Sequence, residues 1–339
     1  MSSNLDFVRS IAVLMVLFDH ILETLGTFYG FKPYPYAYYL GRIGVILFFV
    51  LTSLVLLKSL ERGKQSGKSS VFGFFLRRAF RIYPLSILCV LSVVALEIPA
   101  TSWQSGYQPV GLQQLFANIT LTQNLFYAKS ILSVLWSLPY EMQMYLCLPF
   151  IFWFLDGQQS IRNALGLWLI GVVLAIVQPM LIGRLSIAQF APCFLAGGIT
   201  FALGRASRAR LPFAVLPISM AILVAGYFVI ANFSKDVHPR WLGWSFCLTL
   251  GVLLPYVKEL QISWLRRTFM ELARYSYGIY LFHMFALWCG FNLMQQKPLA
   301  LKIVISAAVL STLAISGHHL IEKPGIEIGA RIASRISKE

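Results

Sequence analysis

Residues 5–20 read LDFVRSIAVLMVLFDH, an apolar run with an arginine near its start and a histidine at its end. An α-helix needs about 20 predominantly apolar residues to cross the hydrocarbon core of a bilayer. The run therefore predicts a membrane-spanning helix over residues 7–26. Asp19 and His20 lie inside it and no small-residue cleavage pattern follows, so we do not expect a signal peptide that is removed.

Apolar runs of this kind recur along all 339 residues, of which 58% are hydrophobic and 12% are charged. A soluble domain is roughly 25% charged, so water is not the main solvent of this chain. We predict an all-α fold, a polytopic membrane helix bundle of about ten transmembrane helices that forms a single domain over residues 1–339. The predicted spans are 7–26, 41–57, 82–98, 134–155, 164–182, 187–203, 212–231, 241–257, 275–294 and 299–320.

The formal net charge is +15, but the basic residues sit mainly in short segments between the apolar runs. No soluble segment is long enough for a basic nucleic-acid-binding face, so no nucleic-acid partner is expected. With the N-terminus in the cytoplasm, Arg9 and the inner segments hold 20 of the 28 Lys and Arg residues. Cytoplasmic segments are enriched in these residues, so both termini are predicted to be cytoplasmic. The inner segments are 58–81, 156–163, 204–211, 258–274 and 321–339, and the outer basic residues are Lys32, Arg42, Lys129, Arg184, Lys235, Arg240, Lys297 and Lys302.

Five cysteines are spread singly through apolar stretches, without the C-x-x-C spacing of a metal or redox pair. We interpret them as small apolar packing residues, and no metal cofactor is expected. They are Cys89, Cys147, Cys193, Cys247 and Cys289.

Arg9 and His20 are separated by eleven residues within the first predicted span. At 100° per residue this spacing returns them to within about 20° of one helix face, roughly 16 Å apart along the axis. Ionisable side chains inside a span are costly, and by default they face protein or water and mark function. The alternative is that Arg9 extends to the inner interface and His20 makes a structural hydrogen bond to another helix.

The fourth predicted span places Glu141 in the stretch LWSLPYEMQMYLCLP. Entering from outside near Val134, the span should hold Glu141 about 10 Å below the outer edge of the membrane. His20 should lie roughly 10 Å from the same edge of a core about 30 Å thick, so the two groups are expected at similar depth. A carboxylate beside an imidazole fixes its tautomer and raises its basicity. Asp19 is a second possible partner of His20, although it points about 100° away, and a purely structural hydrogen bond of Glu141 is the alternative.

The segment VFGFFLRRAFRIYP is amphipathic and basic, as expected for a helix at an anionic membrane surface just before the third span. It contains Arg77, Arg78 and Arg81, of which the last two share one helical face. Paired guanidinium groups bind phosphate bidentately, so a phosphorylated donor on the cytoplasmic side is one interpretation. Binding of anionic lipid, or enforcement of the topology, is the other.

Three further histidines are interpreted structurally. His283 lies in RYSYGIYLFHMF, in apolar surroundings where a hydrogen-bonded core histidine is expected. His318 and His319 lie at the inner end of the last span beside Glu322, where anchoring at the interface is the simplest account.

Taken together, the motifs resemble the family-3 membrane acyltransferases. The resembling pieces are, in order, LDFVRSIAVLMVLFDH, GRIGVILFFVLTS, FLRRAFRIYPLSIL, LWSLPYEMQMYL, YSYGIYLFH and IEKP. Each piece alone is weakly specific, but their order and spacing run through most of the chain. The chain departs from the family pattern at residues 51–54, which read LTSL where related sequences often read LSGF, and no appended esterase-like domain is expected.

The resemblance implies a bundle of about ten membrane helices that moves an acyl group, often acetyl from cytoplasmic acetyl-CoA, onto a hydroxyl of a bacterial surface or secreted sugar. It implies His20 as the catalytic base or acyl carrier, Arg9 as its pocket partner, and Glu141 as the group that orients or assists it. Arg78 and Arg81, with Arg77 beside them, would contact the phosphates of the acyl-CoA donor.

The expected partners are therefore acyl-CoA, a carbohydrate or glycolipid acceptor and the lipid bilayer, and the expected location is the bacterial cytoplasmic membrane. Two other classes of protein remain open. A transporter or flippase for a lipid-linked sugar would use the same polar groups to line a path, although the related halves typical of transporters are not visible in the sequence. A non-catalytic membrane scaffold would not need Arg9, His20 and Glu141 in its spans.

Overall fold

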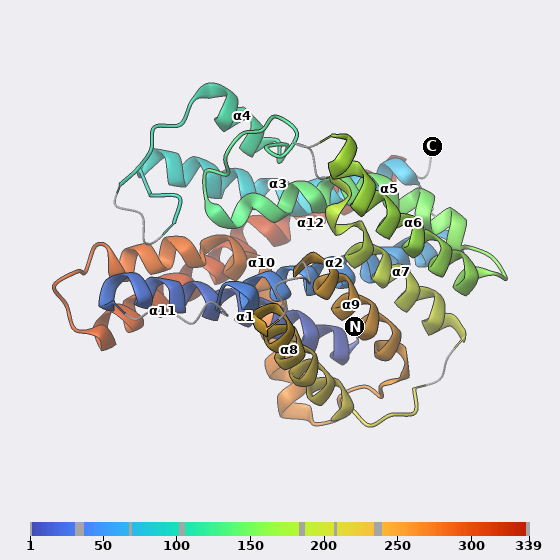
Figure 1. Cartoon of the computed structure of the whole chain (residues 1–339). Helices are drawn as coiled ribbons and strands as arrows, with labels where there is room; N and C mark the ends of the chain where they lie inside the picture. Colours follow the sequence, from blue (N-terminus) through green and yellow to red (C-terminus); the bar gives the residue numbers. More distant parts are fainter. Residues whose placement is uncertain are drawn as a thin grey trace. The chain divides into compact units, whose positions relative to one another are not determined.

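The computed structural model describes residues 2–30, 37–67, 70–101, 106–182, 187–206, 209–233 and 239–336 (Figure 1). All of the elements in these ranges are helical apart from an isolated β-bridge between Leu211 and Val257, so the all-α prediction is confirmed for them. Several basic residues counted for the topology lie outside the described residues: Lys32, Lys68, Arg184, Arg208, Lys235 and Lys338.

An α-helix lies over each of the ten predicted spans, and α4 and α12 are additional. The α-helices are α1 (Ser3–Tyr29), α2 (Ala37–Gln65), α3 (Val71–Ala95), α4 (Leu112–Ile119), α5 (Leu138–Leu155), α6 (Ser160–Leu181), α7 (Ala191–Ala206), α8 (Val215–Phe233), α9 (Pro239–Leu253), α10 (Ser263–Phe291), α11 (Leu299–Gly317) and α12 (Lys323–Ile336). Short helical turns η1 (Ser133–Ser137), η2 (Ile187–Phe190) and η3 (Leu254–Tyr256) flank α5, α7 and α9, and the π-helical turn η4 (His318–Glu322) joins α11 to α12.

Five helical stretches in the described residues are long and apolar enough to cross a membrane. They are Tyr39–Gln65, Val71–Ala95, Ser160–Leu181, Val215–Phe233 and Leu299–Ile336. The helices α7 and α9 have 16 and 15 residues, fewer than the roughly 17 that a spanning helix needs, and α1 and α10 carry charged side chains. The number of ten spans and the cytoplasmic placement of the termini therefore stay predictions.

The chain divides into two compact units, each assembled from separate segments. The first contains residues 1–15, 39–67 and 143–273, and the second contains residues 16–38, 68–142 and 274–339. The helices α1, α2, α5 and α10 begin in one unit and end in the other. The single membrane domain predicted over residues 1–339 stays a prediction.

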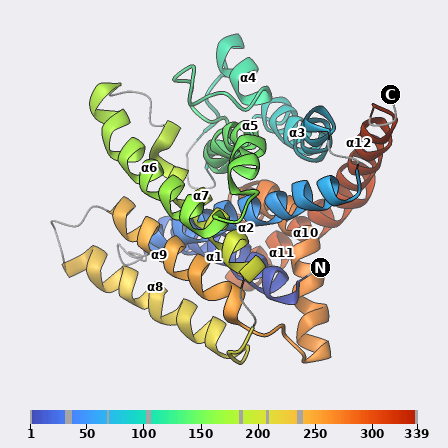
Figure 2. The ribbon, with the colours of Figure 1, turned by 90° about the vertical axis from the view of Figure 1, so that its right-hand side faces the viewer.

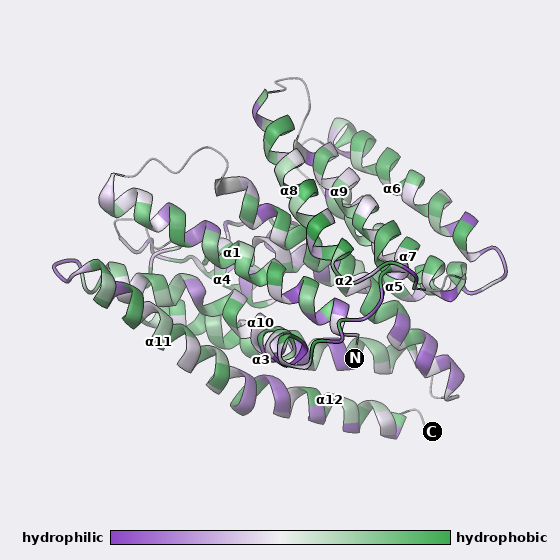
Figure 3. Ribbon diagram, turned by 90° about the horizontal axis from the view of Figure 1, so that it is seen from below, coloured by the Kyte–Doolittle hydropathy of each residue, from purple (hydrophilic) through white to green (hydrophobic). Residues whose placement is uncertain are grey.

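In the first unit, α6, α7, α9 and α8 follow one another as neighbours (Figure 2). Glycine allows the backbones to approach closely here, as in many membrane helix pairs. A Cβ atom on Gly197 of α7 would lie 2.3 Å from the Val50 carbonyl oxygen of α2, and one on Gly251 of α9 would lie 2.8 Å from the Ala196 carbonyl oxygen. In the most apolar stretch of α2, 72% of the residues are buried, whereas in those of α6 and α8 only 17% are buried. Many apolar side chains of α6 and α8 are therefore exposed, as expected for helices in contact with lipid, and the ribbons of both helices are coloured mainly as hydrophobic in Figure 3.

One end of the first unit gathers several segments that the sequence places on the same side of the membrane. The Glu259 carboxylate accepts hydrogen bonds from the Ser3 hydroxyl (2.7 Å) and the Asn4 N–H (3.0 Å). Burial raises the pKa of Glu259, but these hydrogen bonds outweigh it and hold that pKa below its usual value. The Lys258 N–H donates to the Leu211 carbonyl. The N-terminus and segments 204–211 and 258–274 therefore meet at one end, in agreement with a shared side.

In the second unit, the basic stretch is continuous with the third span, as α3 runs unbroken from Val71 to Ala95. The helix expected at the surface and the third span are thus one helix, and the point at which it enters the membrane stays a prediction. The interior Pro84 has no N–H to donate to the Phe80 carbonyl, and α12 packs on that position. A Cβ atom on Gly325 would lie 2.6 Å from the Phe80 carbonyl oxygen, and one on Gly329 would lie 2.7 Å from the Phe80 Cβ.

The last predicted span also continues further than expected. The helices α11 and α12 join through η4 into one stretch of 38 residues, Leu299–Ile336, which at 1.5 Å per residue is about 57 Å long. This length exceeds a hydrocarbon core of about 30 Å. In the α12 part, Gly325, Gly329 and Ala333 are buried on the side that packs on α3, whereas Lys323, Glu327 and Arg331 are exposed. The ribbon of α12 accordingly carries both hydrophilic and hydrophobic colours in Figure 3.

Candidate functional site

Two histidines from distant parts of the sequence form the centre of the candidate site, in the second unit. His20 on α1 and His283 on α10 have ring centroids 4.9 Å apart, and His20 Nδ1 lies 3.2 Å from His283 Nε2. His20 Nδ1 also lies 2.9 Å from the Val16 carbonyl oxygen, and His283 Nδ1 lies 2.8 Å from the Tyr280 carbonyl oxygen. Both rings are thus anchored to the helices that carry them.

The carbonyl partners fix where the protons lie. A carbonyl oxygen only accepts hydrogen bonds, so Nδ1 is the protonated nitrogen in both neutral rings. His283 Nε2 then carries a lone pair and accepts the bond from His20 Nδ1–H. The lone pair of His20 lies on Nε2, which is its basic and nucleophilic atom. When Nε2 takes up a proton, the bond to His283 becomes charge-assisted and stronger.

Two carboxylates lie beside His20 on the same helix. The ligand atoms of Asp19, His20 and Glu23 lie within 4.8 Å of one another, and Asp19 is only 4% exposed. The sequence expectation that Asp19 points away from His20 is therefore too simple, because its carboxylate still comes close to the ring. These three groups are also of the types that hold divalent metals, so the absence of a metal stays a prediction.

Glu141, in the first turn of α5, lies near the helix that carries His283. It interacts electrostatically with the hydroxyl groups of Tyr277 and Tyr280 on α10. The Tyr280 hydroxyl lies 2.7 Å from the Ser137 hydroxyl and 2.7 Å from the Val134 carbonyl oxygen, which ties α10 to the start of α5. The predicted support of His20 by Glu141 stays a prediction, because the structure gives His283 and the Val16 carbonyl as the partners of His20 Nδ1.

Arg9 belongs to the first unit and His20 to the second, on the same helix α1. Within the first unit, Arg9 interacts electrostatically with Asp6, one turn before it. The prediction that Arg9 and His20 line one pocket remains a prediction from helix geometry.

Arg77, Arg78 and Arg81 are all half-buried on the N-terminal half of α3. At 100° per residue, they lie about 60°, 160° and 100° around the helix from Phe80, the residue on which α12 packs. Arg77 borders the α12 contact, because a Cβ atom on Gly73 would lie 3.3 Å from Arg77 Nη1 and 3.4 Å from the Ala333 Cβ of α12. The structure keeps Arg78 and Arg81 on one side of the helix, as predicted.

The sequence interpretation missed two residues. His283 was assigned to core packing, and only the tertiary structure brings it to His20 from 263 positions away. Glu23 could have been found, because the spacing i, i+3 from His20 places both on one side of a helix. His318 and Glu322 form a separate contact in η4, with His318 Nδ1 2.8 Å from the Glu322 carboxylate.

Among known protein families, the one described as an acyltransferase domain matches residues 2–317. The match covers nearly the whole chain and ends where η4 begins, so the resemblance drawn from the motifs is confirmed. No curated protein and no solved structure matches the chain.

Proposed function

The chain belongs to this acyltransferase family, and on that premise we propose that it transfers an acyl group, namely acetyl, from acyl-CoA to a hydroxyl of a sugar. The acceptor is a glycan or glycolipid at the surface of a bacterial cytoplasmic membrane. The observation that carries the proposal is the His20–His283 pair, in which the contacts of His20 Nδ1 with the Val16 carbonyl and with His283 Nε2 favour a proton on Nδ1 and leave Nε2 as the basic atom.

His20 Nε2 accepts the proton of the acceptor hydroxyl while that oxygen attacks the thioester carbonyl carbon. The carbon–sulfur bond breaks, and the proton on His20 Nε2 passes to the departing thiolate. His283 Nε2 accepts the hydrogen bond from His20 Nδ1 throughout, which stabilises the imidazolium between the two proton transfers. In the other route, His20 Nε2 attacks the thioester carbon, the carbon–sulfur bond breaks and the thiolate leaves. The acceptor hydroxyl then attacks the acyl carbon, the carbon–nitrogen bond to His20 breaks, and the hydroxyl proton passes to the thiolate.

The donor end of the site is assigned to the arginine face of α3. Arg78 and Arg81 are one turn apart, and guanidinium pairs match phosphate oxygens in geometry and charge. Gln at either position is expected to raise the KM for acyl-CoA by roughly tenfold, while kcat changes less. Equal KM values for the variants and the wild type would place the donor phosphates elsewhere.

The test of the proposal compares two histidine variants. His20→Gln is expected to abolish both CoA release and glycan acylation in membranes, while His319→Gln, on an exposed histidine of η4, keeps wild-type activity. Immunoblots confirm that both variants reach the membrane in equal amounts. Wild-type activity in His20→Gln would refute the role of His20, and movement of a lipid-linked sugar without CoA release would favour a flippase.

A further inference from the structure

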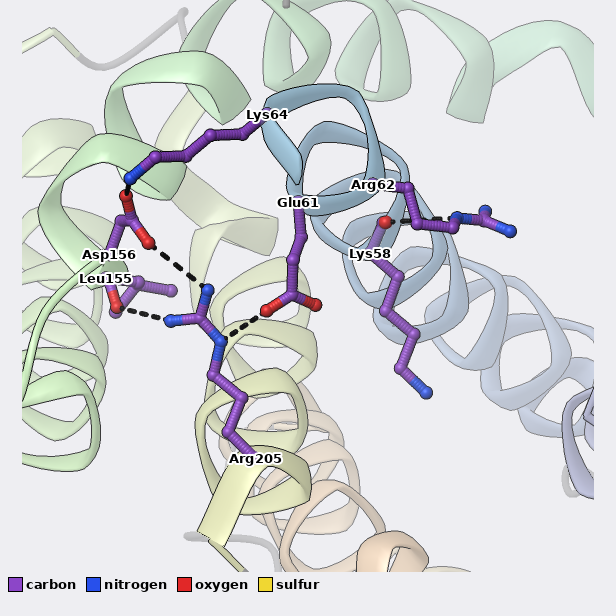
Figure 4. Close-up of polar contacts among 7 residues, drawn as sticks. All are labelled: Lys58, Glu61, Arg62, Lys64, Leu155, Asp156 and Arg205. Carbon is purple, nitrogen blue, oxygen red and sulfur yellow. Dashed lines mark hydrogen bonds and ion pairs between the residues drawn. The ribbon is translucent and has the colours of Figure 1, made fainter. Parts of the chain in front are cut away.

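An ion-pair network joins three cytoplasm-assigned segments of the first unit (Figure 4). Arg205 at the end of α7 donates from Nε to Glu61 on α2 (2.6 Å) and from Nη2 to Asp156 after α5 (3.3 Å). Lys64 on α2 pairs with the second oxygen of Asp156. The hydrogen bond from Lys64, together with Arg205, holds the pKa of Asp156 below its usual range, so this carboxylate stays ionised at neutral pH.

A cavity of about 550 Å³ adjoins this network, lined by residues from the α5–α6 connection, the first turns of α6 and the end of α7. Its volume lies within the roughly 300–1,000 Å³ typical of small-molecule sites. Arg162 and Arg205 both line it. Arg205 is held in place by its carboxylate partners and by the Phe201 ring, 4.5 Å from its guanidinium carbon.

The N-terminus of α6 opens into the same cavity. Gln159, the residue that caps α6, makes no side-chain hydrogen bond to the helix, so the first N–H groups are not capped by it. Ser160 is 7% exposed and lines the cavity, and its hydroxyl has no hydrogen-bond partner among the described residues. An unsatisfied buried hydroxyl costs free energy, and a ligand oxygen in the cavity would satisfy it.

The charges around the cavity favour an anion. The carboxylates of Glu61 and Asp156 balance the charges of Lys64 and Arg205 within the network. Arg162 adds one positive charge that these pairs do not cancel, and the helix N-terminus adds about half of another. Helix N-termini with uncapped N–H groups and a nearby arginine are well suited to phosphate oxygens.

We propose that this cavity binds the phosphate group of a small-molecule-sized ligand, held by the N-terminus of α6, the Ser160 hydroxyl and Arg162. The phosphate belongs either to a soluble molecule such as CoA or to the headgroup of an anionic phospholipid. The site shares no residue with the histidine pair or with the arginines of α3, and the inference does not depend on the acyl-transfer chemistry.

The test uses the full-length protein in lipid-free detergent and two probes, CoA and short-chain phosphatidylglycerol. Gln159→Asp places a carboxylate in the cavity at a position where Asp caps helices well, so the melting temperature should not fall. Gln159→Asn caps the helix without the charge. Arg162→Gln removes the cavity cation, and Arg266→Gln removes an exposed arginine on α10 as its control.

Binding of at least one probe should weaken roughly tenfold in Gln159→Asp and in Arg162→Gln, and should stay within about twofold of wild type in the two controls. A loss confined to CoA identifies a soluble phosphate ligand, and a loss confined to phosphatidylglycerol identifies a lipid headgroup. The proposal is overturned if the wild type binds neither probe, or if all four variants bind as the wild type does. It is also overturned if Gln159→Asn loses as much affinity as Gln159→Asp and Arg266→Gln loses as much as Arg162→Gln. Binding is measured without turnover, so a failed acyltransferase assay would leave this result unchanged.

Discussion

Two substitutions of His283 distinguish the contribution of its hydrogen bond to His20 from that of its packing. Phe at this position keeps an aromatic ring of similar size but removes the nitrogen that accepts from His20 Nδ1. Gln places an amide oxygen near the position of Nε2 and keeps an acceptor. His283 is only 1% exposed, so neither variant gains a compensating bond from bulk water.

The size of the effect follows from the 3.2 Å contact between the two rings. During proton transfer the bond is charge-assisted, and such bonds contribute about 1.5–3 kcal/mol. His20 Nδ1–H keeps its 2.9 Å contact with the Val16 carbonyl oxygen in His283→Phe, so the lower end of this range applies. At 1.36 kcal/mol per tenfold change in rate, kcat should fall roughly tenfold. His283→Gln should keep kcat within roughly fivefold of the wild type.

The assay is steady-state CoA release in detergent, with glycan acylation measured in parallel by mass spectrometry. The KM for acyl-CoA should remain near the wild-type value in both variants, because His283 acts through His20 and touches no phosphate-binding residue. The reasoning is refuted if His283→Phe keeps kcat within about twofold of the wild type, or if Phe and Gln lower kcat equally with intact folding.

Two further predictions concern stability. Gly325→Val should destabilise the protein by about 1–3 kcal/mol, because its Cβ would lie 2.6 Å from the Phe80 carbonyl oxygen. Thermal melting in detergent measures this loss, and Ala330→Val, on the exposed face of α12, is the control. The prediction is contradicted if the melting temperature of Gly325→Val is unchanged or if that of Ala330→Val falls equally. Asp156→Asn should destabilise the first unit at neutral pH, and its stability should equal that of the wild type at acidic pH. The folded-state pKa of Asp156 lies below its usual value, so its pairing with Lys64 stabilises the protein above about pH 4 and is lost as the pH falls through the folded-state pKa. Melting curves of wild type and variant that differ equally at pH 7 and pH 3 would contradict this linkage.

Much of the helical layout could be predicted from hydropathy alone. An apolar run of about 20 residues must satisfy its backbone hydrogen bonds internally when it lies in lipid, so each such run becomes a helix whatever its neighbours are. The ends were less predictable. The amphipathic pattern before residue 82 predicts a helix there, but the helix after residue 320 and its packing on α3 through Gly325 and Gly329 are not encoded in hydropathy.

The sequence by itself determined an all-helical membrane protein with an arginine and a histidine on one face of its first helix, because helical periodicity is a local property. Local spacing also limits Asp19 and Glu23 to the neighbourhood of His20. The partner of that histidine was decided by tertiary structure. His283 looks like a core residue when only its apolar neighbours are known, and it becomes a partner of His20 because α1 and α10 meet within the second unit. A hydrogen bond between residues 263 positions apart depends on how helices pack, and periodicity within one helix carries no information about that packing.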